Sequence, residues 1–260
     1  MKLLKPSALL LAWVCVLLSP GALAEPVLAH VYPIKDVHDI RVNGGAKVEI
    51  RQGKTESLRA EAAQSVLDRV YVDLSNGRLK LGVKSGERGF FNWFSFSNDN
   101  VKFIVEVKDL SRLELSGASS AVIGDLRLNE LEFYLNGASR ATVGRLETTK
   151  LKVDLSGAVH VNIEQLNSKR FEAEISGASN MEVKSGAVDE ARVNASGASK
   201  YYGHGLEGGT VKAHVNGASR VEVHARNALD VHASGASHVT YYGDPAVSQS
   251  SSGASSIKRL

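Results

Sequence analysis

Serine recurs at regular intervals in the second half of this chain, and a serine hydroxyl can act as a nucleophile. The segment Ser-Gly-Ala-Ser, or a close variant of it, occurs eight times between residues 116 and 255. A nucleophilic serine needs a general base positioned beside it. Eight near-identical segments cannot each have such a base, so these serines are expected to build structure rather than to react.

Two histidines offer a second kind of chemistry. His214 and His232 occupy equivalent positions in successive repeats, so their side chains are expected to project side by side. Two imidazoles at strand spacing, joined by a carboxylate, can bind a transition metal. The alternative is a pair of ordinary surface histidines. We favour this alternative and predict neither a metal nor any other cofactor.

Carboxylates are the third candidate, because β-helical enzymes that cut acidic polysaccharides use clustered carboxylates, often with calcium and a basic residue. Here the charged residues at one repeat position mostly alternate in sign: Glu132, Lys152, Glu172, Arg192, Lys212 and Asp230. Such alternation favours neutral ladders across neighbouring strands. We therefore predict a protein that is not an enzyme. A carbohydrate-active enzyme is the alternative, indicated by a cleft that gathers two carboxylates with a basic residue.

One short segment is unusually aromatic. It contains five of the nine phenylalanine and tryptophan residues of the chain, namely Phe90, Phe91, Trp93, Phe94 and Phe96. Glycine-rich and polar residues flank it, which predicts a protruding loop. Exposed aromatic rings are typical of a site for a partner, a membrane surface or a sugar. Alternatively, the segment folds back and caps the core.

The repeated glycines show which elements must carry these residues. They are Gly117, Gly137, Gly157, Gly177, Gly197, Gly217, Gly235 and Gly253, spaced 20 residues apart and then 18 at the last two intervals. On both sides of each glycine, apolar residues alternate with polar ones, which is the periodicity of a strand. Each repeat is thus a strand, a tight glycine corner and a second strand. Stacked repeats of this kind predict an all-β, single-domain parallel β-helix, a solenoid of about 20 residues per coil.

The segment before the regular repeats follows the same pattern less strictly. Residues 40–50 form a strand, a glycine corner and a strand. Strands are predicted at 70–74 and 78–83, joined by an Asn-Gly turn, and another at 101–107. A single helical turn is predicted at 64–68. We expect irregular coils over 36–110 and regular repeats over 111–260, within one domain spanning 25–260.

The first 24 residues have the pattern of a signal peptide. Two lysines precede an apolar stretch, and Ala22-Leu23-Ala24 offers a cleavage site. Cleavage would remove Cys15, the only cysteine, together with two of the 31 basic residues, leaving 29 against 28 acidic ones and a net charge of +1. This balance predicts no nucleic-acid partner, and no apolar run in the mature chain is long enough to span a membrane.

Four segments together resemble the head GIN domain family of auto-transporter adhesins. They are Ile-Arg-Val-Asn-Gly at 40–44, Val-Glu-Ile-Arg-Gln-Gly at 48–53, Asn-Gly-Arg-Leu-Lys-Leu at 76–81 and Leu-Ser-Arg-Leu-Glu-Leu-Ser-Gly at 110–117. The resemblance implies a right-handed β-helix related in shape to pectin-lyase-like proteins, and a role in adhesion. It transfers no catalytic motif.

These features predict an exported, non-enzymatic protein that presents a binding or adhesion surface in the bacterial cell envelope. Its expected partner is an envelope protein or a glycan. No outer-membrane translocator follows the repeats, so the periplasm is favoured over the cell surface. The last coil reaches Leu260 without a capping element, and free strand edges allow pairing. End-to-end stacking into a homo-oligomeric envelope scaffold is therefore a further alternative.

Overall fold

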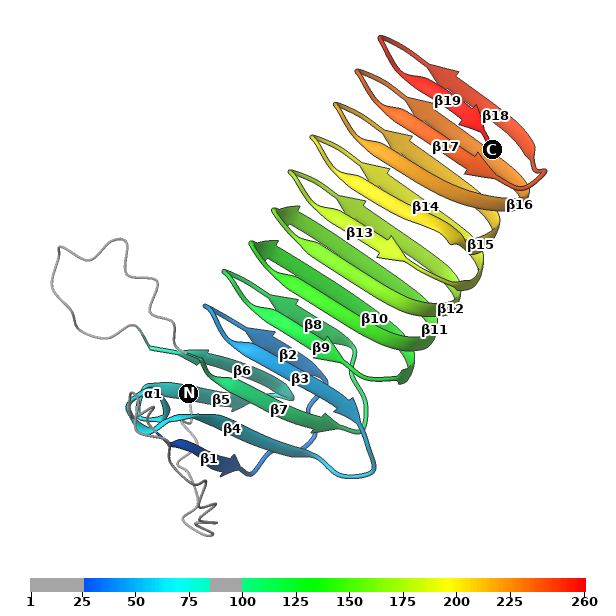
Figure 1. The fold of residues 1–260 in the computed structure, drawn as a ribbon. Coiled ribbons are helices and arrows are strands. Elements are labelled where there is room, and N and C mark those ends of the chain that lie inside the picture. The colour runs from blue at the N-terminus through cyan, green and yellow to red at the C-terminus, as the bar shows by residue number, and fades with distance from the viewer. Residues whose placement is uncertain (1–25, 85–99) are drawn as a thin grey trace, which may run out of the picture.

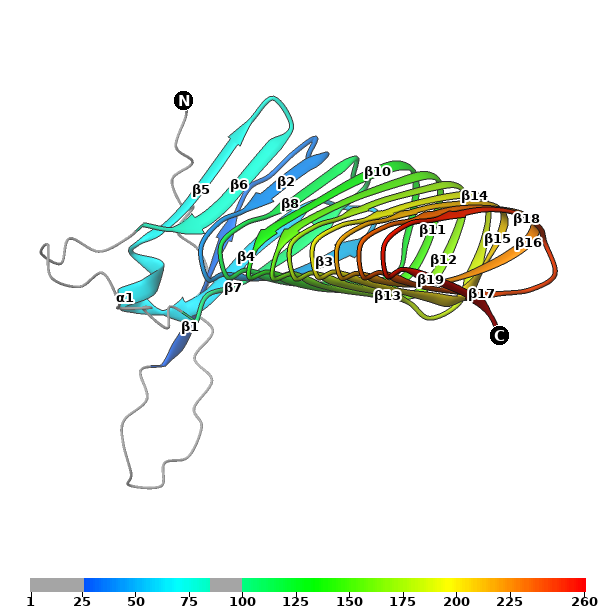
Figure 2. The ribbon, with the colours of Figure 1, turned by 90° about the horizontal axis from the view of Figure 1, so that it is seen from above.

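The computed structural model describes residues 26–84 and 100–260, which form one 19-stranded sheet and a short helix. The predicted signal peptide and the aromatic segment 90–96 lie outside the described residues. Successive coils stack along one axis, with β19 at the far end (Figure 1). Figure 2 shows them nested behind one another as flattened loops. Within the described part of the chain, no helix is long and apolar enough to cross a membrane.

The regular coils run from residue 112 to residue 259. Their strands are β8 (Arg112–Leu115), β9 (Ser120–Ile123), β10 (Leu126–Gly137), β11 (Arg140–Gly157), β12 (His160–Ile175), β13 (Asn180–Val183), β14 (Gly186–Ala195), β15 (Lys200–Val215), β16 (Arg220–Ala233), β17 (His238–Tyr242), β18 (Ala246–Ser251) and β19 (Ser256–Arg259). All pairings among them are parallel, and partners lie one repeat apart, as Leu135 and Leu155 do. The predicted parallel β-solenoid is confirmed, with about 7 turns whose coils lie about 20 residues apart.

Apolar and polar residues alternate along the strands, so the apolar side chains point into the coils. Equivalent apolar residues of successive coils stack there into columns. The inward residues just before the corners are buried from coil to coil: Leu115, Leu135, Leu155, Ile175, Ala195, Val215 and Ala233. A second buried column follows the corners, and Leu126, Leu146, Leu166 and Leu206 fill the opposite end of the coil. Burial of these columns is the main term that favours folding, since apolar burial contributes about 25 cal/mol per Å².

The first part of the chain differs from coils stacked in chain order. It contains β1 (Val27–Tyr32), β2 (Asp39–Val42), β3 (Lys47–Gln52), β4 (Ser57–Ala63), α1 (Gln64–Leu67), β5 (Val70–Ser75), β6 (Arg78–Val83) and β7 (Lys102–Val107). The coil made by β2 and β3 lies between the β6–β7 coil and the β8–β9 coil. The alternation of apolar and polar residues shows which side chains of a strand point inward, but it does not show which strand pairs with it. The sequence pattern alone therefore does not reveal the order of these coils.

Antiparallel strands close the N-terminal end of the solenoid. β4 pairs with β7, β5 pairs with β6, and β1 pairs with β4, all antiparallel. The helical turn α1 connects β4 to β5 and buries Leu67. Asn76 and Gly77 both have positive φ, of 50° and 71°, as a tight hairpin turn requires. These strands cover what would otherwise be an open edge of the β6–β7 coil.

Candidate functional site

The corner glycines lie in a stack along one edge of the solenoid. All eight have positive φ, between 73° and 101°. In each coil the amide of the next residue donates to the carbonyl of the preceding corner glycine, as Ala158 does to Gly137 at 2.8 Å. A Cβ on Gly137 would lie 2.6 Å from the carbonyl oxygen of Gly117. The corners therefore stack backbone on backbone, a geometry in which only glycine fits.

Two columns of hydroxyl and amide groups accompany the glycines. Serine or asparagine precedes each corner glycine, and these side chains are hydrogen-bonded where serine meets asparagine: Ser116 donates to Asn43 and Ser156 to Asn136, both at 2.5 Å. The serines after the corner form a second column that is buried, with Ser139 donating to the carbonyl of Asn136 at 2.7 Å. These hydroxyls serve the corner backbone. The sequence carries a signal for the buried column, because Ser119 is in phase with the inward residues Ala121 and Ile123 and because valine takes the serine's place at 159.

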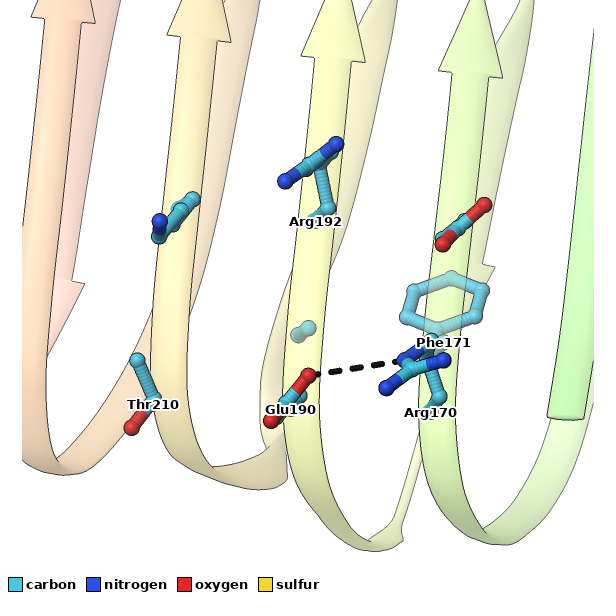
Figure 3. A pocket seen from close by; sticks show the side chains of 8 residues that line it. Arg170, Phe171, Glu190, Arg192 and Thr210 are labelled. Carbon is cyan, nitrogen blue, oxygen red and sulfur yellow. Dashed lines mark hydrogen bonds and ion pairs between the residues drawn. The ribbon is translucent and has the colours of Figure 1, made fainter. Parts of the chain in front are cut away.

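A groove with a volume of about 400 Å³ crosses the outer surface of β12, β14 and β15 (Figure 3). Its lining residues are Arg170, Phe171, Glu172, Glu190, Ala191, Arg192, Thr210 and Lys212. The groove lies over Ala191, the smallest residue of an inward column that otherwise contains leucine, valine and phenylalanine. It brings two carboxylates together with basic groups, the arrangement that the sequence argument associated with the enzyme alternative.

The charges in this groove are arranged as a surface ladder. Arg170 Nε lies 3.4 Å from Glu190 Oε2. Glu172 stands opposite Lys152 on one side and Arg192 on the other. Each carboxylate thus has a cationic neighbour in the adjoining coil, as the alternating charges predict.

A second groove, of about 430 Å³, lies nearer the corners and contains His214. His214 stands opposite His232, and their ring centroids are 5.0 Å apart, so the two imidazoles project side by side as expected. His232 Nε2 also lies 3.3 Å from Asp230 Oδ1. Among the residues that the structure describes, no group of three or more His, Cys, Asp or Glu side chains is placed to hold a metal ion.

A cluster of rings surrounds a break in the regular pairing of β15 with β16. The register shifts between Gly203 and Glu207 and again between Gly208 and Thr210, within a glycine-rich stretch. The Tyr242 ring centroid lies 6.0 Å from that of His204 and 6.5 Å from that of His224. His204 Nδ1 lies 3.5 Å from Glu222 Oε2. These ring positions keep the period of the corners, since Tyr242 stands opposite His224 in regular register, so the repeat was the signal that could have revealed the cluster.

Charged side chains near the N-terminal end of the solenoid form close ion pairs with one another. Burial opposes ionisation of Asp39, but hydrogen bonds and charge from Arg41 and Arg78 outweigh it and lower the pKa of this carboxyl. Arg78 Nε lies 2.7 Å from Asp39 Oδ2. Hydrogen bonds from Lys102 and Arg51 similarly lower the pKa of Glu49. These groups join neighbouring coils and are structural in character.

Comparison with known families agrees with this architecture. Residues 36–245 match the family described as "Putative auto-transporter adhesin, head GIN domain". The chain belongs to this family. The match covers the glycine corners up to Gly235 and the antiparallel N-terminal end of this GIN domain except β1. Among curated proteins, no sequence matches the chain.

Solved structures show the same fold in proteins from Parabacteroides species. A "Putative lipid binding protein" from Parabacteroides distasonis is 21% identical with a TM-score of 0.80, covering 90% of this chain and 96% of its own. A "putative adhesin" from the same species is 18% identical with a TM-score of 0.77, covering 91% and 98%. Another from Parabacteroides merdae is 19% identical with a TM-score of 0.72, covering 90% and 96%. At these identities the likeness establishes the fold.

Proposed function

We propose that this GIN-domain protein is an exported, non-enzymatic solenoid that presents a binding or adhesion surface in the bacterial cell envelope. The observation that carries the proposal is the array of parallel coils, which repeats outward side chains at strand spacing over a long rigid face. Repeat folds of this shape use extended surfaces for binding. Membership of an adhesin family and similarity to structures called adhesins support it.

Export to the periplasm is the cellular part of the proposal. It is supported by the lysines, apolar stretch and Ala-Leu-Ala site within residues 1–24. Expression of the full chain followed by fractionation and N-terminal sequencing tests it. We expect a periplasmic product that begins at Glu25. An uncleaved product that stays in the cytoplasm would refute export.

The aromatic segment 90–96 is proposed as a binding element, with capping of the core as its alternative. Trp93 is the only tryptophan besides Trp13, so cleavage of the first 24 residues leaves it as the single tryptophan whose fluorescence can be followed. If the segment binds a partner, emission is red-shifted and acrylamide quenches it readily. Replacing Phe91, Trp93 and Phe94 by serine then abolishes capture of envelope components while stability changes by no more than about 0.5 kcal/mol. Blue-shifted emission with a loss of several kcal/mol indicates capping instead.

The groove over Ala191 supports a second candidate function, an enzyme acting on acidic polysaccharide. It places Glu172 and Glu190 beside three basic side chains. Acid–base cleavage of such a polymer would use these two carboxylates. Incubation with polygalacturonate, followed by detection of new reducing ends, tests this function. Turnover that Glu190→Gln abolishes would establish the enzyme and refute the non-enzymatic proposal.

A further inference from the structure

Along the coils, one outward column next to the glycine corners contains basic and neutral residues and no acidic one, although Glu61 of the antiparallel strand β4 stands opposite its first member, Lys102. In the order in which the strands pair, it consists of Lys102, Lys47, Ser120, Arg140, His160, Asn180, Lys200, Arg220, His238 and Ser256. We name this set the basic column. It follows the solenoid axis on the face just after the corners, with neighbouring members about 4.8 Å apart.

The cations of this column are largely left without partners. Lys102 pairs with Glu49 at 2.7 Å. By contrast, Arg140, Lys200 and Arg220 are exposed and form no ion pair with any described residue. Lys200 stands directly opposite Arg220, and like charges in that position destabilise a sheet. A bound anion would remove this repulsion.

The face just before the corners has the opposite character. There Arg112 pairs with Glu132, and Arg170 pairs with Glu190. Like charges also meet on that face, since Lys150 stands opposite Arg170 and Arg192 opposite Lys212. Its columns nevertheless contain acidic residues that pair with some of the cations, whereas the basic column contains none.

Ring and hydrogen-bonding side chains adjoin the basic column over β15, β16 and β17. On the same faces of these strands, the next positions are Tyr202, Glu222 and Thr240, followed by His204, His224 and Tyr242. Tyr202, His224 and Tyr242 are half-buried, whereas His204 is exposed. Sugars bind proteins through aromatic faces and nearby polar groups, so cations and rings here form a mixed surface suited to a charged sugar chain.

We propose that the basic column binds a linear anionic polysaccharide that lies along the solenoid axis. Lys200 and Arg220 pair with its acidic groups, and the half-buried ring of Tyr202, in the adjoining column, contacts its sugars. The inference rests on the proposed binding function and names its ligand class and its face. A linear polymer fits better than an anionic bilayer, because a flat negative surface would also meet Glu182 and Glu222 in the adjoining column.

Binding of the full mature chain to polygalacturonate tests the proposal, with fully methyl-esterified polygalacturonate as the neutral comparison. The key variant is Lys200→Gln with Arg220→Gln. The matched control is Lys150→Gln with Lys152→Gln, which removes the same charge from the face before the corners. Thermal unfolding of each variant verifies its fold. An anionic lipid vesicle and a single-stranded oligonucleotide serve as competing probes.

We expect the acidic polymer to bind and the neutral ester not to bind. The key variant should weaken binding by about tenfold or more, since a charged hydrogen bond contributes roughly 1.5–3 kcal/mol. The control should change it by less than about twofold, and added salt should weaken binding in all forms. Equal losses in the key variant and the control would overturn the proposal, because binding would then follow net charge alone.

Two further outcomes would also overturn it. One is tighter binding of the vesicle or the oligonucleotide with the same dependence on Lys200 and Arg220. The other is no binding of polygalacturonate while the protein still captures other envelope components. The second outcome leaves the proposed function intact, whereas failure to capture any envelope component refutes that function as well.

Discussion

The carbonyl oxygen of Gly137 lies 2.5 Å from the position that a Cβ on Gly157 would occupy. The same oxygen accepts the amide hydrogen of Ala158 at 2.8 Å. The carbonyl oxygen of Gly137 thus accepts a hydrogen bond from Ala158 in the next coil and leaves no room for a side chain at residue 157. The close stacking of the corners and the glycine repeat in the sequence have this single cause.

Replacing Gly157 by alanine should therefore destabilise the solenoid. Its φ of 101° is unfavourable for any residue with a Cβ, and the added carbon would meet backbone that has little freedom to move. We expect a loss of about 1–3 kcal/mol, the usual cost of local backbone strain. Gly45→Ala is the matched control, since nothing lies within 4 Å of a Cβ there. Equal melting temperatures for the two variants would contradict this account of the corners.

The buried serine column should contribute through its hydrogen bonds to the corner. Ser139 is 1% exposed and donates to the carbonyl of Asn136, whereas Val159 occupies the same position one coil later and is fully buried. Ser139→Ala should cost about 1 kcal/mol, lowering the melting temperature by roughly 2–4 °C. Ser139→Val should be milder than Ser139→Ala because valine already fits this column. A valine variant less stable than the alanine variant would refute the comparison.

Acid should weaken the Asp39 cluster. The folded pKa of Asp39 is lowered relative to its ordinary value of 3.8. Its contribution is therefore complete above that ordinary value and is lost as the pH falls through the lower, folded pKa. Asp39→Asn should cost about 1.5–3 kcal/mol at pH 7, where charged hydrogen bonds are removed, and the difference from the natural protein should shrink in strong acid. Urea unfolding across pH measures this.

Asp36→Asn is the control for that experiment. Asp36 is exposed, and its Oδ2 lies 3.9 Å from Lys35 Nζ. Such surface ion pairs contribute little to stability. Asparagine also tolerates the positive φ of this position. If Asp36→Asn lowers stability as much as Asp39→Asn does, the net charge of the protein, and not the pairing of Asp39 with its arginines, governs the dependence of stability on pH.

The regular coils could be predicted from the sequence because each column repeats: the position of Leu155 predicts the burial of Leu135 and Ile175. The N-terminal end could not, because β2 and β6 both show inward–outward alternation and nothing in either marks its neighbour. The side-by-side placement of His214 and His232 followed from the period alone. The pairing of His224 with Tyr242 follows from the period as well, whereas the register shift between Gly203 and Glu207 does not.

Tyr201 and Gly203 show how two departures from the repeat compensate. Tyr201 is buried in a column where the coils on either side contribute Met181 and Val221. Gly203 occupies the position that Val183 and Val223 hold in the adjoining coils. A Cβ on Gly203 would lie 2.4 Å from the Tyr201 hydroxyl oxygen and 2.5 Å from a ring carbon. The tyrosine ring thus fills the space that the missing side chain leaves.

Replacing Tyr201 by a smaller residue and Gly203 by a larger one should reveal the energetic coupling between the two positions. Tyr201→Val should cost about 3 kcal/mol or more by leaving a cavity, and Gly203→Val should cost about 1–3 kcal/mol by overpacking against the ring. The double variant restores the pattern of the adjoining coils, so it should be more stable than the sum of the single effects predicts, by about 0.5–3 kcal/mol. Chemical unfolding of all four proteins completes the cycle. Strict additivity would mean that the two positions are not coupled and that the ring does not fill the space at Gly203.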